Sequence, residues 1–115
     1  MGYVILRKNK TFAEQVTKEN TIYEIRYDYD LDEGEVTIPT NCTLKFNGGS
    51  ISNGTFRLTN TLLLPLGLNM RDYILEGVSV TGNYREGQTV YDSALKKQKL
   101  WNGSSWVNLD GTALE

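Results

Sequence analysis

The segment between residues 36 and 58 reads VTIPTNCTLKFNGGSISNGTFRL and holds four short stretches of strand-forming residues. These stretches are 36–38, 43–46, 50–52 and 55–58, and the turn-forming residues at 39–41, 47–49 and 53–54 separate them. Strands this short, with turns this frequent, are poor material for antiparallel hairpins. They fit the coils of a β-solenoid, in which each strand pairs with its counterpart one coil later.

A weak internal repeat predicts the length of one coil. Shifting the sequence by about 29 residues sets 44–52 over 73–81, so that Gly48 meets Gly77 and Ser50 meets Ser79. The block 36–83 would then hold fewer than two coils, whereas solenoids generally need about three and capped ends. Either the strands expected earlier in the chain complete the stack, or neighbouring chains do. The second alternative predicts a homo-oligomer, most naturally a trimer.

The first 35 residues predict a lead-in of strand, short helix and strand. The expected strands cover 3–7 and 21–27, and the expected helix covers 12–18. Thr11 stands three residues before Glu14, which is the spacing of a capping box. Alternation along the second strand favours a buried face made of Tyr23, Ile25 and Tyr27.

Residues 84–115 predict a separate module of three strands, at 88–92, 99–101 and 106–109. Asn102-Gly103 is a strong hairpin signal, and it sets Trp101 and Trp106 on one face of the hairpin. The two rings would lie directly opposite each other across a four-residue loop and diagonally across a two-residue loop. With Tyr91 they could form a platform that stacks on sugar rings. The favoured alternative is that they pack the hairpin onto the solenoid end or against another subunit.

The predicted fold class is therefore all-β. A short right-handed β-solenoid (36–83) follows the N-terminal lead-in with its brief helix (1–35), and a three-stranded β-hairpin module (84–115) ends the chain.

Composition excludes several kinds of chemistry. The chain has 115 residues, 12 of them basic and 14 acidic, which gives a net charge of −2 and predicts no binding to nucleic acid. Histidine is absent and Cys42 is the single cysteine, so catalytic triads and zinc sites based on these residues are excluded within the chain. No apolar run approaches the roughly 20 residues that a membrane helix needs, and no signal peptide is visible. We expect no cofactor.

The acidic stretch before the solenoid invites two functional interpretations. Asp28, Asp30 and Asp32 alternate as in a calcium loop, but Glu33 and Pro39 stand where such a loop needs glycine and glutamate. We therefore expect an exposed acidic turn and no metal site. Carboxylate pairs also serve glycoside cleavage. Because two coils offer no long substrate groove, we expect no catalytic residues and no enzymatic activity.

Two smaller expectations concern side chains outside the core. Asn47 and Asn53 could stack as a ladder inside a coil. Lys96, Lys97 and Lys99 are expected to form a solvated edge that prevents pairing with another sheet.

Two segments carry a family resemblance. The stretch 20–55, and above all its pattern apolar-Thr-Ile-Pro-x-Asn-Cys-x-Leu-x-Phe-x-Gly-Gly-Ser at 36–50, resembles the opening of right-handed β-helix proteins from phages and prophages of Bacteroides-like gut bacteria. The stretch 91–111 resembles a small C-terminal module of phage tail-fibre and tail-spike proteins from the same hosts. The Gly-Thr-Thr-x-x-Arg-Pro segment that usually precedes this module is missing here. Family members often have many coils between the two segments, where this chain has only residues 56–90.

This resemblance implies a structural protein of a virion or a bacterial cell surface. It implies a non-enzymatic part of a tail fibre or spike, and a host-surface polysaccharide is the expected contact. The contact residues would be Tyr91, Trp101 and Trp106. A carbohydrate-binding module and a fragment of a polysaccharide depolymerase are the alternatives.

Overall fold

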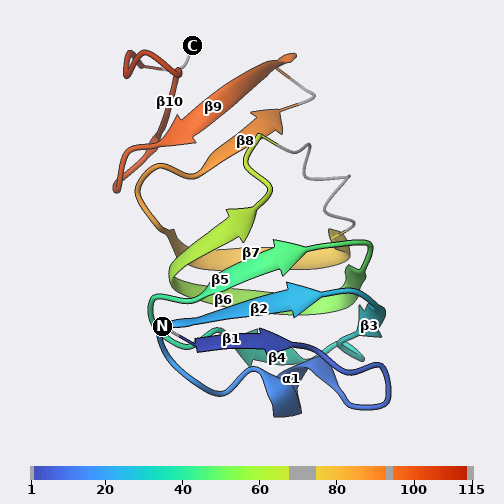
Figure 1. The fold of residues 1–115 in the computed structure, drawn as a ribbon. Coiled ribbons are helices and arrows are strands. Elements are labelled where there is room, and N and C mark those ends of the chain that lie inside the picture. Colours follow the sequence, from blue (N-terminus) through green and yellow to red (C-terminus); the bar gives the residue numbers. More distant parts are fainter. Residues whose placement is uncertain (1, 68–74, 93–94, 114–115) are drawn as a thin grey trace.

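Parallel pairing between strands far apart in the sequence defines the fold. The computed structural model describes residues 2–67, 75–92 and 95–113. Its strands form about three stacked turns of a β-solenoid, and a small antiparallel sheet lies beyond the last turn (Figure 1). The predicted all-β solenoid with a brief helix is therefore confirmed. The elements are β1 (Gly2–Ile5), α1 (Phe12–Gln15), β2 (Thr21–Ile25), β3 (Asp28–Asp30), β4 (Glu35–Thr37), β5 (Thr43–Phe46), β6 (Ser50–Leu64), β7 (Leu75–Tyr84), β8 (Thr89–Asp92), β9 (Lys97–Trp101) and β10 (Trp106–Val107).

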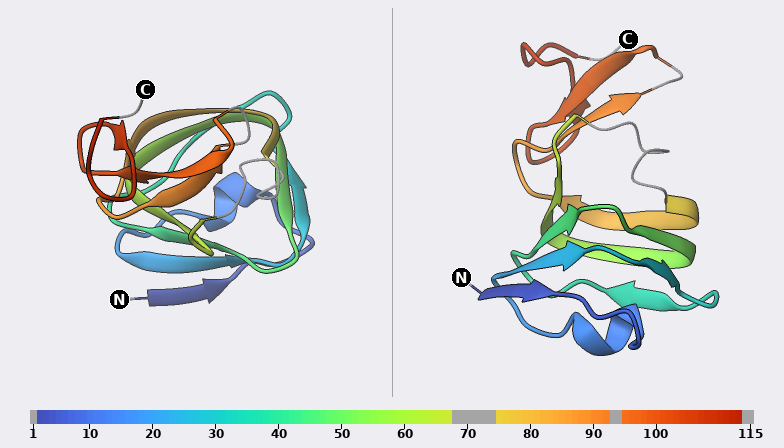
Figure 2. Two further views of the ribbon diagram at one scale, coloured as in Figure 1. Left: turned by 90° about the horizontal axis from the view of Figure 1, so that it is seen from above. Right: turned by 45° about the vertical axis from the view of Figure 1, so that its right-hand side comes forward.

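The solenoid has two parallel walls. Sheet A contains β1, β2, β5 and residues 62–64 of β6, while sheet B contains β3, β4, β7 and the earlier part of β6. Figure 2 shows, from above, how the strands run around the perimeter of each coil. Sheet C, made of β8, β9 and β10, is antiparallel and separate.

The predicted coil length of about 29 residues is wrong. Residues paired across neighbouring coils lie between 19 and 24 positions apart, as for Asn60 with Asn41 and Ile51 with Leu75. The expected shift would have placed Ile51 on Val80, whereas Val80 pairs with Phe56. Because the corners between strands differ in length, no single shift aligns every strand of one coil with the next. Tyr73 and Ile74, which began the second copy of the proposed repeat, lie outside the described residues.

The early strands extend the stack within the chain. Tyr3 in β1 pairs with Ile22 in β2, and Ile22 pairs with Thr43 in β5. Strand β3 likewise pairs with β6 in sheet B. The first of the two alternatives for completing the solenoid is thus correct. Completion of the stack therefore gives no support to the trimer, which stays a prediction.

Side chains from equivalent strand positions stack to form the core. Val4, Tyr23, Leu44 and Leu63 make one such row across sheet A, and the last three are fully buried. Burial of aromatic and aliphatic side chains in this way is the main stabilising contribution to the fold. This row accounts for the predicted alternation along residues 21–25, in which Tyr23 and Ile25 are buried in the core.

The expected burial of Tyr27 is wrong, because its side chain is 41% exposed. Strand β2 ends at Ile25, and the chain then turns a corner, after which Tyr29 enters the core. Gly49 packs against this corner so closely that a Cβ atom there would lie 2.4 Å from the carbonyl oxygen of Tyr27. The corner therefore changes which residues face the core, so that Tyr29 is buried and Tyr27 is not.

Helix α1 closes one end of the solenoid. The predicted capping box is confirmed: the Thr11 hydroxyl accepts from the backbone of Glu14, and the Glu14 carboxylate accepts from that of Thr11. Phe12 is buried, and its ring centroid lies 5.4 Å from that of Phe56 and 5.9 Å from that of Tyr29. No helix in the described part of the chain has the length and hydropathy to cross a membrane.

The helix is shorter than the expected 12–18 and ends at Gln15. The backbone N–H groups of Thr17 and Lys18 donate to the hydroxyl of Tyr23, at 3.2 and 2.8 Å, where a longer helix would use its own carbonyls. A buried residue of β2 thus ends the helix, which local sequence could not reveal.

Gln88 caps the other end of sheet A. Its side chain is fully buried, its Oε1 accepts from the backbone N–H of Leu63 at 2.6 Å, and its Nε2 donates to the carbonyl of Leu63 at 3.1 Å. The amide thus supplies the hydrogen bonds that the backbone of a further strand would otherwise provide. Gln88 therefore closes the edge of sheet A at Leu63.

An asparagine ladder runs along one corner of the coils. The Asn41 Nδ2 donates to the Asn20 Oδ1 at 2.8 Å, and the Asn60 Nδ2 donates to the Asn41 Oδ1 at 3.2 Å. All three residues have a left-handed backbone, with φ values of 54°, 59° and 55°. The expected ladder of Asn47 and Asn53 is wrong, since their amides donate to Glu24 and Asp30.

The middle of this ladder gives a test of how the corners are held. We expect Asn41→Ala to lower the free energy of unfolding by about 2 kcal/mol, because it removes both side-chain bonds and strains the left-handed backbone. Asn41→Gly removes the same bonds and tolerates positive φ, so it is expected to lose about 1 kcal/mol less. Chemical denaturation of both variants measures the difference. If the two variants were equally stable, the positive φ at position 41 would impose no strain on alanine, and this explanation of the corner would be wrong.

Candidate functional site

The hairpin that carries both tryptophans has a four-residue loop. Trp101 and Trp106 are direct partners across β9 and β10, and their ring centroids lie 5.3 Å apart with the planes at 68°. The Asn102 Oδ1 accepts from the backbone N–H groups of Ser104 and Ser105, both at 2.9 Å, while Gly103 takes φ +101°. The predicted pairing of the two indoles is confirmed in its directly opposite form.

Tyr84 completes this aromatic cluster from the solenoid side. Its ring centroid lies 5.1 Å from that of Trp106 and 6.0 Å from that of Trp101. Burial raises the pKa of Tyr84 to about 12. Trp106 also packs against the main core. The tryptophans thus join sheet C to the last coil, as the favoured interpretation of the sequence held, and sequence analysis missed Tyr84 because nothing in its local pattern indicates this contact.

The structure does not bring Tyr91 together with the tryptophans. Tyr91 pairs with Gln98, and Val90 pairs with Lys99. Since neighbouring residues of a strand point to opposite faces, Lys99 and Trp101 share one face of sheet C and Tyr91 lies on the other. A single platform of three rings is therefore not formed.

The lysines of the module do not form the expected solvated edge. Strand β9 is the central strand of sheet C, and the Lys99 Nζ lies 3.1 Å from the Asp92 carboxylate and 4.8 Å from the centre of the Trp106 ring. Lys96 is exposed in the turn before β9, with φ 56°. The edge interpretation failed because the strand order of the sheet was unknown.

The acidic turn is held by local hydrogen bonds. Asp28 accepts from the Ser50 hydroxyl at 2.7 Å, and Asp30 accepts from the Asp32 backbone at 2.7 Å. Across residues 2–67, 75–92 and 95–113, no group of three or more carboxylate or thiol side chains is arranged to hold a metal ion.

A second cluster with chemical potential lies on the outer face of sheet A, where sequence analysis placed no site. Ile5, Glu24, Lys45 and Leu64 form one outward row across the four strands. The side chain of Glu24 is only 4% exposed, although the position faces outward. Its carboxylate accepts hydrogen bonds from the Tyr3 hydroxyl, the Arg26 Nε and, at 3.3 Å, the Asn47 Nδ2.

These hydrogen bonds stabilise the ionised form of the Glu24 carboxylate. The hydrogen bonds from Tyr3 and then Arg26 lower the pKa of Glu24 from 4.5 to about 2. A carboxyl group whose pKa falls on folding stabilises the folded state above its unfolded pKa, and this stabilisation is lost as the pH falls toward the folded value.

The pH dependence of stability tests this network. Between pH 4.5 and about 2, the wild-type free energy of unfolding is expected to fall more steeply than that of Glu24→Gln, which has no charge to lose at this position. Denaturation at several pH values measures both slopes. Glu35→Gln, which removes an exposed carboxylate, serves as the control. Parallel slopes for wild type and Glu24→Gln would show that Glu24 titrates normally.

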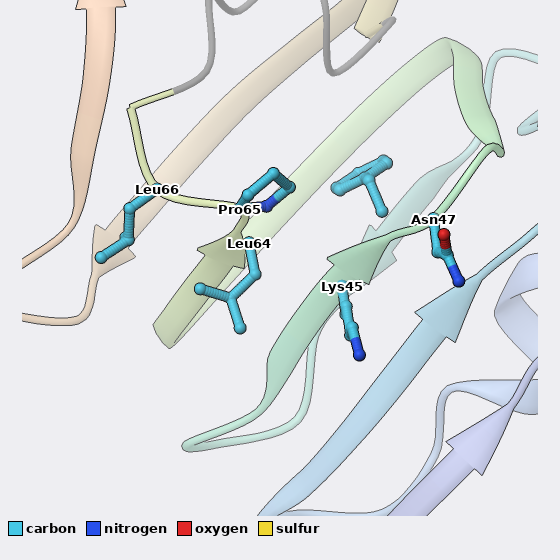
Figure 3. Close-up of a pocket in the computed structure, with 6 residues that line it drawn as sticks. Lys45, Asn47, Leu64, Pro65 and Leu66 are labelled. Carbon is cyan, nitrogen blue, oxygen red and sulfur yellow. The ribbon is translucent and has the colours of Figure 1, made fainter.

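A hollow of about 550 Å³ adjoins this cluster at the ends of β5 and β6. Figure 3 shows Lys45 and Asn47 on one side of it and Leu64, Pro65 and Leu66 on the other, and Phe46 also lines it. The Lys45 Nζ lies 3.9 Å from the Glu24 carboxylate and 3.5 Å from the Tyr3 hydroxyl. The apolar residue pattern at 62–66 was visible in the sequence, but which side chains stand beside it depends on the register of sheet A.

The chain matches no protein-family model. No significant similarity links it to a curated protein or to a solved structure.

Proposed function

We propose that the chain is a non-enzymatic structural component of a phage or prophage tail fibre or spike, at the surface of a virion or bacterial cell. One observation carries the proposal. The residues that resemble the phage β-helix proteins form the stacked coils from β2 to β6, and those that resemble the tail-fibre module form most of sheet C at the end of the stack (Figure 1). The molecule is elongated, with extents of 43 × 28 × 22 Å, which suits a segment of a fibre.

The proposed assembly is a homotrimer. Large apolar side chains stay exposed in the C-terminal module, where Leu109 is 57% exposed and Leu95 is 40% exposed. Association of chains through this module would remove such side chains from water, which is favourable. Leu109→Lys is the variant expected to weaken this contact.

The proposed ligand is a host-surface polysaccharide, contacted by the accessible parts of Trp101 and Trp106. Trp101 and Trp106 are residues that are only partly buried, and tryptophan presents a large apolar face to the C–H groups of a sugar ring. Tyr91, on the other face of sheet C, would make a separate contact.

Gel electrophoresis through host capsular polysaccharide tests this contact. We expect the polysaccharide to retard the wild-type chain and Trp101→Leu to be retarded less, since leucine keeps an apolar group but removes the ring. Tyr27→Leu, which removes an exposed ring of the solenoid, is the matched control, and circular dichroism checks the fold of both variants. Equal retardation of Trp101→Leu and wild type would contradict the tryptophan contact, and an unretarded wild type would contradict polysaccharide binding. Release of reducing or unsaturated sugar ends would contradict a non-enzymatic role.

A further inference from the structure

The hollow beside β5 and β6 combines an apolar wall with a polar rim. Leu64, Pro65 and Leu66 supply aliphatic surface, while Lys45 and Asn47 stand across from them (Figure 3). Its volume of about 550 Å³ falls within the range typical of sites for small ligands. Such a combination suits a ligand that has one apolar face and several polar groups.

The charges around the hollow favour an anion. Glu24 carries the one carboxylate of the cluster, and hydrogen bonds from Tyr3, Arg26 and Asn47 already compensate it. Arg26 and Lys45 bring two positive charges, so the cluster has a net charge of +1. The side chain of Lys45 is 45% exposed and lines the hollow, so its ammonium group has donors to offer a ligand.

Asn47 adds a neutral polar group to the rim. Its Nδ2 donates to Glu24, which directs its Oδ1 away from that carboxylate. An amide oxygen held in this way can accept a hydrogen bond from a ligand hydroxyl.

We propose that this hollow binds an acidic sugar, namely a uronic acid residue of a polysaccharide. The sugar carboxylate pairs with the Lys45 Nζ, a ring hydroxyl donates to the Asn47 Oδ1, and the C–H face of the ring packs on Leu64 and Pro65. The choice of a sugar rests on the proposed function, whereas the choice of an anion rests on the charges of the cluster. The site is distinct from the tryptophan hairpin.

Calorimetric titration with two matched tetrasaccharides tests the proposal. One contains β-1,4-linked glucuronic acid and the other β-1,4-linked glucose. Each ring of the first therefore has a carboxylate where the second has a hydroxymethyl group. We expect the acidic tetrasaccharide to bind the wild-type chain at least about tenfold more tightly than the neutral one, since one charge-assisted hydrogen bond contributes that much. Lys45→Met, which keeps the aliphatic stem, is expected to abolish the preference, and Lys10→Met, which removes an exposed charge elsewhere, is expected to keep it.

The outcomes separate this site from the proposed function. Equal affinity for both sugars, or an acidic preference that survives in Lys45→Met, overturns the uronic acid site. If polysaccharide retards the chain in gels but the acidic tetrasaccharide gives no heat up to millimolar concentration, the site is overturned while the proposed function stands. If the preference depends on Lys45 but the wild-type chain is a persistent monomer, the site stands while the trimeric fibre is contradicted.

Discussion

Gln88→Leu is expected to lower the free energy of unfolding by about 3 kcal/mol, although leucine fills a similar volume. The substitution leaves the backbone N–H and carbonyl of Leu63 without the amide that pairs with them at 2.6 and 3.1 Å. Because Gln88 is fully buried, water cannot replace these bonds without opening the end of the solenoid. Urea denaturation of the variant and the wild type measures the loss.

Amide hydrogen exchange gives the same prediction a local readout. The Leu63 N–H is expected to exchange much faster in Gln88→Leu, whereas the Leu44 N–H, one strand further in, keeps most of its protection. Gln98→Leu replaces an exposed glutamine of β9 and is expected to change stability by less than about 0.5 kcal/mol. If Gln88→Leu were as stable as Gln98→Leu, Gln88 would not be the cap of sheet A.

Phe12→Ala is expected to cost about 4 kcal/mol at the opposite end of the stack. The Phe12 ring is 1% exposed and contacts the rings of Tyr29 and Phe56, so its removal leaves a cavity under the first coil. Phe12→Leu keeps most of the volume and is expected to lose about 1 kcal/mol.

Thermal and urea denaturation distinguish these losses from a general effect of removing an aromatic ring. Tyr27→Ala removes a ring that is 41% exposed and is expected to have a much smaller effect. Should Phe12→Ala unfold no more easily than Tyr27→Ala, helix α1 would be an appendage and not a cap.

The sequence predicted the kind of fold because short strands and glycine-rich turns are local features. It predicted the wrong coil length because the comparison rested on two identical pairs, Gly48 with Gly77 and Ser50 with Ser79, whereas Ser79 pairs with Thr55 in the structure. The asparagines at 20, 41 and 60 mark the same corner in successive coils, and Thr40-Asn41 and Thr59-Asn60 repeat 19 residues apart, which is the spacing seen in the structure. Corner asparagines with positive φ are thus the better signal for this solenoid.

The candidate sites were predictable only where geometry is local. The Asn102-Gly103 turn fixed the pairing of Trp101 and Trp106, since two strands and a short loop determine it. Tyr91 could not be placed, because the four residues between β8 and β9, at 93–96, carry no turn signal like Asn-Gly that would fix the register of the two strands. Glu24 and Lys45 lie 21 residues apart in the sequence and meet only through the register of β2 and β5.

The molar mass in solution tests the proposed trimeric fibre most directly. Light scattering across a tenfold range of concentration is expected to give a constant mass of about three times 13.0 kDa, and Leu109→Lys is expected to shift it toward the single chain. A wild-type mass that stays at 13.0 kDa at every concentration would contradict the account and identify the solenoid as a monomer closed by its own Phe12 and Gln88 caps.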